Sequence, residues 1–182
     1  MIPYVKDITS LFVKHKYKKS KVDVTPDLDH LLKVYANAAP LEQQKIAVLQ
    51  KFVTKYFFAT KHARPDISTS FSFIATRIKS PDKNDWEKLT RMIRYFRGNP
   101  ELALTISANS TSVLKWWVDG SRGFHPNIRV HTGGFISLGK GMPITVSNRQ
   151  KLSTCRSTKT KLVAADYFMP NILWTNYFLE NQ

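Results

Sequence analysis

Acidic side chains are scarce in the last third of this 182-residue chain, and they are the groups that could hold a divalent cation there. From position 119 onward the side-chain carboxylates are Asp119, Asp166 and Glu180. Asp119 follows an apolar run and precedes a glycine, which by default is typical of a turn. Magnesium takes several hard oxygen ligands that converge on one point. The shortage of acids therefore argues against metal-dependent catalysis in this region.

Basic side chains give the chain its second chemical signature. The 28 Lys and Arg residues outnumber the 13 Asp and Glu residues, so the formal net charge is +15 with His neutral. A charge of this size favours a polyanionic partner, either nucleic acid or an anionic membrane surface. Four basic residues recur at intervals of three along one predicted helix: Lys88, Arg91, Arg94 and Arg97. This basic stripe is either a solvated helix face or a surface that contacts phosphates.

Hydropathy and cysteine content indicate in which cellular compartment the protein is expected. An apolar share of 42% is enough for a packed core, yet no run approaches the ~20 apolar residues of a membrane-spanning helix. The first residues lead into polar sequence rather than into the apolar core of a signal peptide. The single cysteine, Cys155, excludes an internal disulfide and favours a reducing compartment. We expect an intracellular protein of the cytoplasm or nucleus that is not secreted and has no membrane partner.

The first hundred residues are expected to contain three helices. Residues 1–40 have weak periodicity and are predicted to be loop. A helix is predicted from Leu41 to just before Pro65, and a second from Pro65 onward, where proline is tolerated at the first position. The third begins at Ser80-Pro81-Asp82, with a capping hydroxyl, and ends at Gly98-Asn99-Pro100. The expected apolar stripes are Ile46, Leu49, Val53, Tyr56 and Phe57; then Ile67, Phe71, Ile74 and Ile78; then Trp86, Leu89, Ile93 and Phe96.

After residue 100 the apolar period changes from 3.6 to 2, which indicates strands. Residues 113–118 are predicted to form a mostly buried strand that ends at Asp119-Gly120, with Trp116 or Trp117 in the core. Residues 135–138 and 144–146 flank Gly139-Lys140-Gly141 and predict a hairpin.

Two short helices are predicted to close the chain. The first runs from Ser157 to about Phe168, and the second follows Pro170. The predicted fold class is α+β with an α/β-like character: a helical segment over residues 1–99, then a mixed sheet with helices over residues 100–182.

The other candidate groups are interpreted as structural rather than functional. His125 and His131 lie six residues apart with no third ligand, so a zinc site is not expected. The Gly139-Lys140-Gly141 segment is not followed by a helix and is predicted to be a turn rather than a phosphate loop. No catalytic histidine pattern accompanies Cys155.

Several short strings occur together in a distinctive order. In the second half they are Trp116-Trp117-Val118-Asp119-Gly120-Ser121, His131-Thr132-Gly133-Gly134, Ser137-Leu138-Gly139-Lys140-Gly141, Arg149-Gln150-Lys151-Leu152, Arg156-Ser157-Thr158 and Leu173-Trp174-Thr175-Asn176-Tyr177-Phe178-Leu179-Glu180. Upstream they are Ala63-Arg64-Pro65-Asp66-Ile67, the helix start between Pro81 and Trp86, and Ile93-Arg94-Tyr95-Phe96-Arg97-Gly98. At these gaps they resemble the ribonuclease H region of copia-type LTR retrotransposon polyproteins, preceded by the reverse transcriptase thumb and connection. The resemblance covers about residues 25–182.

The resemblance implies a two-metal phosphodiesterase centre, with Mg²⁺ as the cofactor of active members. Asp119 matches the first carboxylate of that centre. Lys161 stands at the family's metal-binding glutamate, Lys159 stands at the other glutamate of the same string, and the chain stops at Gln182 before the next family aspartate. The paired aspartates of the polymerase palm do not occur here. We therefore expect Asp119 to be a vestigial ligand, with no cofactor bound. The Lys161 amine is a candidate to take the place of the cation and pair with Asp119.

Three functions remain open. The first is a degenerate polyprotein fragment without catalytic activity. The second is a non-catalytic nucleic-acid-binding module whose basic stripe holds an RNA–DNA hybrid weakly and in a salt-dependent way. The third is a metal-dependent nuclease in which Asp166 or a partner chain completes the site of Asp119. An incomplete ribonuclease H-like sheet would also leave an edge open, so self-association through that edge is expected.

Overall fold

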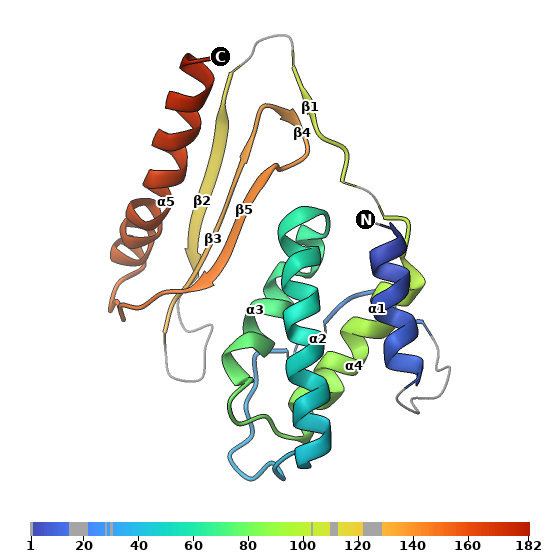
Figure 1. Ribbon diagram of the computed structural model, residues 1–182. Coiled ribbons are helices and arrows are strands. Elements are labelled where there is room, and N and C mark those ends of the chain that lie inside the picture. The colour runs from blue at the N-terminus through green and yellow to red at the C-terminus, as the bar shows by residue number, and fades with distance from the viewer. Residues whose placement is uncertain are drawn as a thin grey trace. The chain divides into compact units, whose positions relative to one another are not determined.

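The computed structural model describes residues 2–14, 22–27, 29, 31–102, 104–109, 113–121 and 129–182. The side chains of Val13 and Lys14 are not described. The chain divides into two compact units, Met1–Ala103 and Leu104–Gln182. The first is helical and the second contains a sheet and one long helix (Figure 1). His125 and most of the lysine-rich segment before residue 22 lie outside the described residues.

The helical unit is built from four α-helices and one 3₁₀ turn. These are α1 (Ile2–Lys14), α2 (Gln43–His62), η1 (Pro65–Ile67), α3 (Ser68–Arg77) and α4 (Lys83–Gly98). The three helices predicted between residues 41 and 99 are confirmed. Their buried faces meet in one core, with Leu49, Phe52 and Tyr56 from α2 against Ile74 and Phe96. Phe57 is half-exposed, so its predicted place in the buried stripe is wrong.

The loop predicted over residues 1–40 is wrong for its first part, because α1 occupies Ile2–Lys14. Val5, Ile8 and Phe12 recur at spacings of three and four and are all buried in the core of the helical unit. The Phe12 ring meets the Phe52 ring of α2 edge-on, with centroids 5.1 Å apart. A helix of this length is stabilised by such packing more than by its own propensity.

The N-terminus of α4 is capped by Asp82 rather than by the predicted Ser80. The Asp82 carboxylate accepts the backbone N–H of Asp85, and the Asp85 carboxylate accepts the backbone N–H of Asp82 in return. Arg77 from the end of α3 binds both acids, at 3.2 Å from Asp82 and 3.0 Å from Asp85. This reciprocal cap satisfies two backbone donors and joins α3 to α4.

The second unit contains a three-stranded sheet in the order β2 (Lys115–Ser121), β3 (His131–Ser137), β5 (Ile144–Arg149). A two-residue strand pair, β1 (Ser107–Ala108) with β4 (Gly139–Lys140), forms a second small sheet. All the described strand pairs are antiparallel, so the α+β class is confirmed while the predicted mixed sheet is not found among the described residues.

The hairpin predicted around Gly139-Lys140-Gly141 forms between β3 and β5, but its centre is more than a turn. Gly139 and Lys140 form β4 and pair with β1. Gly141 then has φ of 77°, a left-handed conformation that favours glycine. A Cβ atom there would lie 2.2 Å from the carbonyl oxygen of Thr105.

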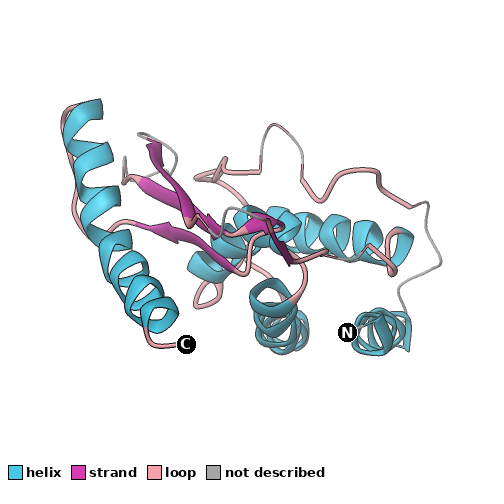
Figure 2. Ribbon diagram, turned by 90° about the horizontal axis from the view of Figure 1, so that it is seen from above, coloured by secondary structure: helices cyan, strands magenta, loops and turns pink. Residues whose placement is uncertain are grey.

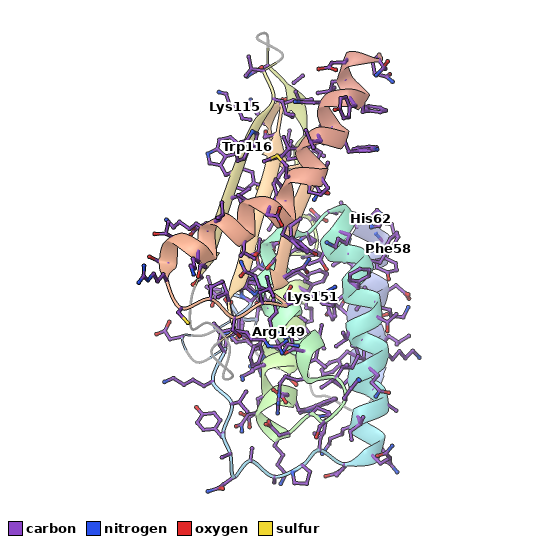
Figure 3. The ribbon with its side chains drawn as sticks, turned by 90° about the vertical axis from the view of Figure 1, so that its left-hand side faces the viewer. Phe58, His62, Lys115, Trp116, Arg149 and Lys151 are labelled. Atoms are coloured by element: carbon purple, nitrogen blue, oxygen red, sulfur yellow. The ribbon has the colours of Figure 1, made fainter. Side chains whose placement is uncertain are left out.

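A single helix, α5 (Ser157–Glu180), replaces the two predicted short helices. Pro170 lies inside it, and Figure 3 shows that the helix bends along its length. A proline in a helix removes one hydrogen bond and crowds the preceding turn, which bends a helix without always ending it. The buried positions Thr160, Ala164, Phe168, Ile172 and Thr175 continue past the proline, so packing against the sheet keeps one helix.

Helix α5 lies along one face of the three-stranded sheet, chiefly against β2 (Figure 2). The small core between them contains Ile136, Phe168 and Ile172, with Val118 and Val146 packed at its border. Strand β2 is not the mostly buried strand that was predicted. Trp116 and Trp117 are 46% and 47% exposed, so the expectation that one of them is core is wrong.

Candidate functional site

Asp119 lies within β2, opposite Gly133 of β3, rather than after the end of the strand as predicted. The next residue, Gly120, faces α5, because a Cβ atom on it would lie 2.7 Å from the Thr160 side chain and 2.8 Å from the Thr160 carbonyl oxygen. Successive side chains of a strand point to opposite faces. Asp119 therefore lies on the other face, on β2, which is one of the two edge strands of the described sheet.

The close approach of Gly120 to Thr160 brings α5 next to Asp119. Thr160 is held in place by its own hydrogen bonds, since its hydroxyl donates to the Arg156 carbonyl and its carbonyl accepts from the side-chain amide of Gln150. Lys161 directly follows Thr160, and its Nζ lies 3.6 Å from Oδ1 of Asp119. The candidate pair suggested by the sequence is therefore in contact.

The Lys161–Asp119 pair is exposed to solvent. The Lys161 side chain is 67% exposed and that of Asp119 is 73% exposed. A surface ion pair of this kind contributes ~0–1 kcal/mol to stability and weakens with salt. Its effect on the site is electrostatic: an ammonium group lies beside the carboxylate that a divalent cation would need.

Asp119 belongs to no metal-binding cluster among the described residues. Asp166 is exposed on α5, and no group of three His, Cys, Asp or Glu side chains that could hold a metal exists among the described residues. His131 lies on β3, where its Nε2 is 2.8 Å from the Ser147 hydroxyl. Cys155 is exposed and free.

The basic stripe of α4 has extensive contacts within the helical unit. Lys88 is 7% exposed, donates to the Lys33 carbonyl at 2.6 Å and lies 4.4 Å from the centroid of the Phe73 ring. Burial lowers the pKa of the Lys88 ammonium. The expectation of a fully solvated stripe is wrong at this residue, because its long side chain spans the core to reach a backbone acceptor.

Two arginines of the stripe share one acidic partner. Asp23 accepts from Arg91 at 3.3 Å and from Arg94 at 2.5 Å, and Arg91 also donates to the Thr25 hydroxyl at 2.9 Å. Arg97, the fourth member, is half-buried near the C-terminus of α4. Sequence reasoning missed Asp23, because it lies 68 and 71 residues away from its two partners.

A cavity of about 650 Å³ lies beside these arginines, within the helical unit. Trp86, Lys88, Arg91 and Arg94 of α4 line one side of it, and residues of the segment before α2, including Asp27 and Tyr35, line the other. Its wall contains both acidic and basic groups, so the basic stripe does not present an unopposed cationic surface there.

Ala63-Arg64-Pro65-Asp66-Ile67, one of the strings that carried the resemblance, has a clear structural role. Arg64 is 1% exposed and binds Asp66 through Nε at 2.9 Å and Nη2 at 2.8 Å. Its Nη1 donates to the Asn99 carbonyl at 2.8 Å, and its guanidinium lies 4.3 Å from the Phe96 ring centroid. The string thus connects η1 to the end of α4.

One aromatic pair lies on the exposed surface of α2. Phe58 and His62, one turn apart on α2, have stacked rings with centroids 4.1 Å apart (Figure 3).

Among the described helices, none combines the length and apolarity required to cross a membrane.

Comparison with known proteins gives a consistent group of relatives. No family model matches the chain, and no solved structure matches it. The chain is 28% identical over 105 residues to a transposon Ty5-1 protein of Saccharomyces cerevisiae, covering 58% of this chain and 34% of that protein. It is 24% identical over 181 residues to the retrovirus-related Pol polyprotein from transposon TNT 1-94 of Nicotiana tabacum, covering 96% of this chain and 14% of the polyprotein.

A third relative is the retrovirus-related Pol polyprotein from transposon RE2 of Arabidopsis thaliana, 25% identical over 95 residues, or 52% of this chain and 6% of that polyprotein. The chain therefore spans about a third of the yeast relative and a smaller part of each plant relative. By sequence similarity, it corresponds to a region of retrotransposon Pol polyproteins.

Proposed function

We propose that the chain is a degenerate region of a copia-type Pol polyprotein and does not catalyse phosphodiester hydrolysis. In this proposal the helical unit corresponds to the reverse transcriptase thumb and connection, and the second unit to the first part of a ribonuclease H domain. The similarity to Pol polyproteins and the antiparallel strands followed by a helix across their face support the assignment.

The observation that carries the proposal is the contact between Lys161 Nζ and Asp119 Oδ1, at 3.6 Å. A ribonuclease H reaction uses two divalent ions that activate water and stabilise the leaving oxygen. The residues near Asp119 do not fit such ions, because the neighbouring side chain supplies a cation instead of an oxygen ligand. The repulsion between the ammonium and a divalent ion opposes binding of that ion.

A magnesium titration followed by ¹H–¹⁵N NMR tests this proposal directly. We expect no saturable shift of the Asp119, Gly120 and Lys161 amides between 0 and on the order of 10 mM Mg²⁺, a range that covers weak carboxylate sites. A saturable shift confined to these amides would contradict it. Potassium chloride at the same ionic strength serves as the control for non-specific charge screening.

The second candidate is non-catalytic binding of nucleic acid, which is favoured by the net charge of +15. An RNA–DNA hybrid would be held through its phosphates, and affinity would fall steeply with salt. Arg91 and Arg94 could contribute only in competition with Asp23, and Lys88 contributes little because it is buried. Hybrid affinity that does not change between about 50 and 200 mM salt would reject this candidate.

A further inference from the structure

The outer face of α5 carries large apolar side chains that nothing in its own unit covers. The buried face of this helix packs on the sheet, and the opposite face is turned away from it (Figure 2). The exposed apolar residues of α5 are Leu162, Tyr167, Met169, Leu173, Trp174, Tyr177, Phe178 and Leu179. Single exposed apolar residues are ordinary, but a contiguous set on one helix marks an interaction surface.

The spacing along the outer face defines one continuous stripe. We call it the outer stripe: Lys159, Leu162, Asp166, Met169, Leu173, Tyr177 and Glu180. The intervals of three and four keep these residues on the side opposite to Ala164, Phe168 and Thr175, which are buried. Trp174 lies beside the stripe near its C-terminal end, and its ring stacks on that of Phe178, on the Thr160 side of the helix, with centroids 5.5 Å apart.

We propose that the outer stripe is the interface of a homodimer in which the α5 helices of two copies pack antiparallel. Reversing the stripe about Met169 and Pro170 matches it to itself. Leu162 then lies opposite Tyr177 of the second copy, Lys159 opposite Glu180, and Asp166 opposite Leu173. Both ends of the interface therefore carry a basic residue opposite an acidic one, whereas parallel packing would place like charges together.

The exposed area is close to what a dimer requires. Leu162, Met169, Leu173, Trp174 and Tyr177 together expose roughly 600 Å² of apolar surface, given the areas usual for their side chains and their exposed fractions. A standard interface buries ~800 Å² per partner. The remainder would come from contacts at the border of the two helices.

The charge distribution on α5 also favours a second copy of the chain, rather than nucleic acid, as the partner that covers this face. Between Asp166 and Glu180 the helix has no charged residue, although the chain carries a net charge of +15. A neutral apolar surface gives a polyanion nothing to bind, but it lets two highly basic chains approach each other. Glu180 of the second copy would also lie near the N-terminus of α5, where the helix dipole favours an acidic group.

The first test measures self-association by sedimentation equilibrium over a concentration series at about 150 mM salt, an ionic strength that screens long-range repulsion. The wild-type chain is expected to be a concentration-dependent dimer. Leu173→Asp should raise the dissociation constant at least tenfold, because it places a second carboxylate opposite Asp166 of the other copy. Leu152→Asp is the matched control, since Leu152 is as exposed but lies before α5, and its dissociation constant should remain that of wild type.

The second test examines orientation by exchange of charges. Lys159→Glu alone and Glu180→Lys alone should each weaken the dimer, and the double variant should restore it. A wild-type chain that is monomeric at all concentrations would overturn the proposal, as would equal effects of Leu173→Asp and Leu152→Asp. A double variant no tighter than the single ones would overturn the antiparallel arrangement. Far-ultraviolet circular dichroism and thermal melting verify that each variant remains folded.

Discussion

The Nζ of Lys161 on α5 lies 3.6 Å from the Oδ1 of Asp119 on β2. This contact exists because Gly120, next to Asp119, has no side chain to keep Thr160, next to Lys161, at a distance. The backbone geometry that would bring a helix ligand to a strand ligand is present. The helix position carries a positive charge instead of a negative one, so the same geometry forms an ion pair.

Restoring the carboxylate should restore affinity for a divalent ion. In Lys161→Glu two carboxylates would lie beside each other, and we expect Mg²⁺ to bind about tenfold more tightly than to wild type, a change of ~1.4 kcal/mol. Isothermal titration calorimetry measures this. Lys51→Glu is the control, because it changes the net charge equally at an exposed position of α2, in the helical unit. Equal Mg²⁺ affinity in all three proteins would show that Lys161 does not govern the site.

The Gly120 position should tolerate no side chain. Gly120→Ala would place a methyl group 2.8 Å from the Thr160 carbonyl oxygen, so α5 must shift, at an expected loss of ~1–3 kcal/mol in the free energy of unfolding. In Gly133→Ala, on the neighbouring strand, the new methyl group has no atom within 4 Å, and the change should lie within about 0.5 kcal/mol. Urea denaturation of the two variants compares them. Equal losses would mean that α5 does not approach β2 as described.

Tyr56→Phe should stabilise the helical unit. Among the described side chains, the Tyr56 hydroxyl is buried with no hydrogen-bond partner, and removing it should add ~1 kcal/mol to the free energy of unfolding. Burial raises the pKa of Tyr56 well above its usual 10.0. Above pH 10.0 the unfolded chain loses this proton before the folded chain does, so wild-type stability falls as pH rises. The advantage of Tyr56→Phe should therefore grow above pH 10.0 in thermal melts, and an advantage that shrinks there would contradict this.

Removing Asp23 should release two arginines. Asp23→Asn takes away the carboxylate shared by Arg91 and Arg94, so an RNA–DNA hybrid should bind several-fold more tightly at low salt if the basic stripe contacts phosphates. Asp29→Asn changes the net charge equally, and no contact of Asp29 with these arginines is described. Fluorescence anisotropy with a labelled hybrid compares the variants. The same gain in both variants would assign the effect to net charge alone.

The apolar periodicity of the sequence predicted those elements whose buried residues recur in a regular local pattern. Helices α2, α3 and α4 and the hairpin between β3 and β5 were all predicted from apolar spacing and turn residues. Helix α1 shows the same signal at Val5, Ile8 and Phe12, but the basic residues that follow it obscured the pattern. At Pro170 the local rule predicts a break, and the continuous apolar contact of Phe168 and Ile172 with the sheet overrides it.

Part of the candidate site could be anticipated from the family resemblance rather than from apolar periodicity. The resemblance made Lys161 a candidate partner of Asp119, although the two positions lie 42 residues apart and no local pattern connects them. The neutralisation of Arg91 and Arg94 by Asp23 was not predictable, since the helix pattern specifies which face they share but not what covers it. The exposure of Trp116 depends likewise on how much of β2 the helix covers, whereas Trp117 lies on the face of β2 that is turned away from α5.

The most direct test of the proposed loss of catalysis is the hydrolysis of the RNA strand of an RNA–DNA hybrid in Mg²⁺. Wild-type protein and Asp119→Asn are compared at equal concentration, with an active ribonuclease H as the positive control. We predict that wild type produces no more cleavage than Asp119→Asn, because Lys161 occupies the place of a metal ligand. Magnesium-dependent cleavage by wild type that disappears in Asp119→Asn would contradict the proposal.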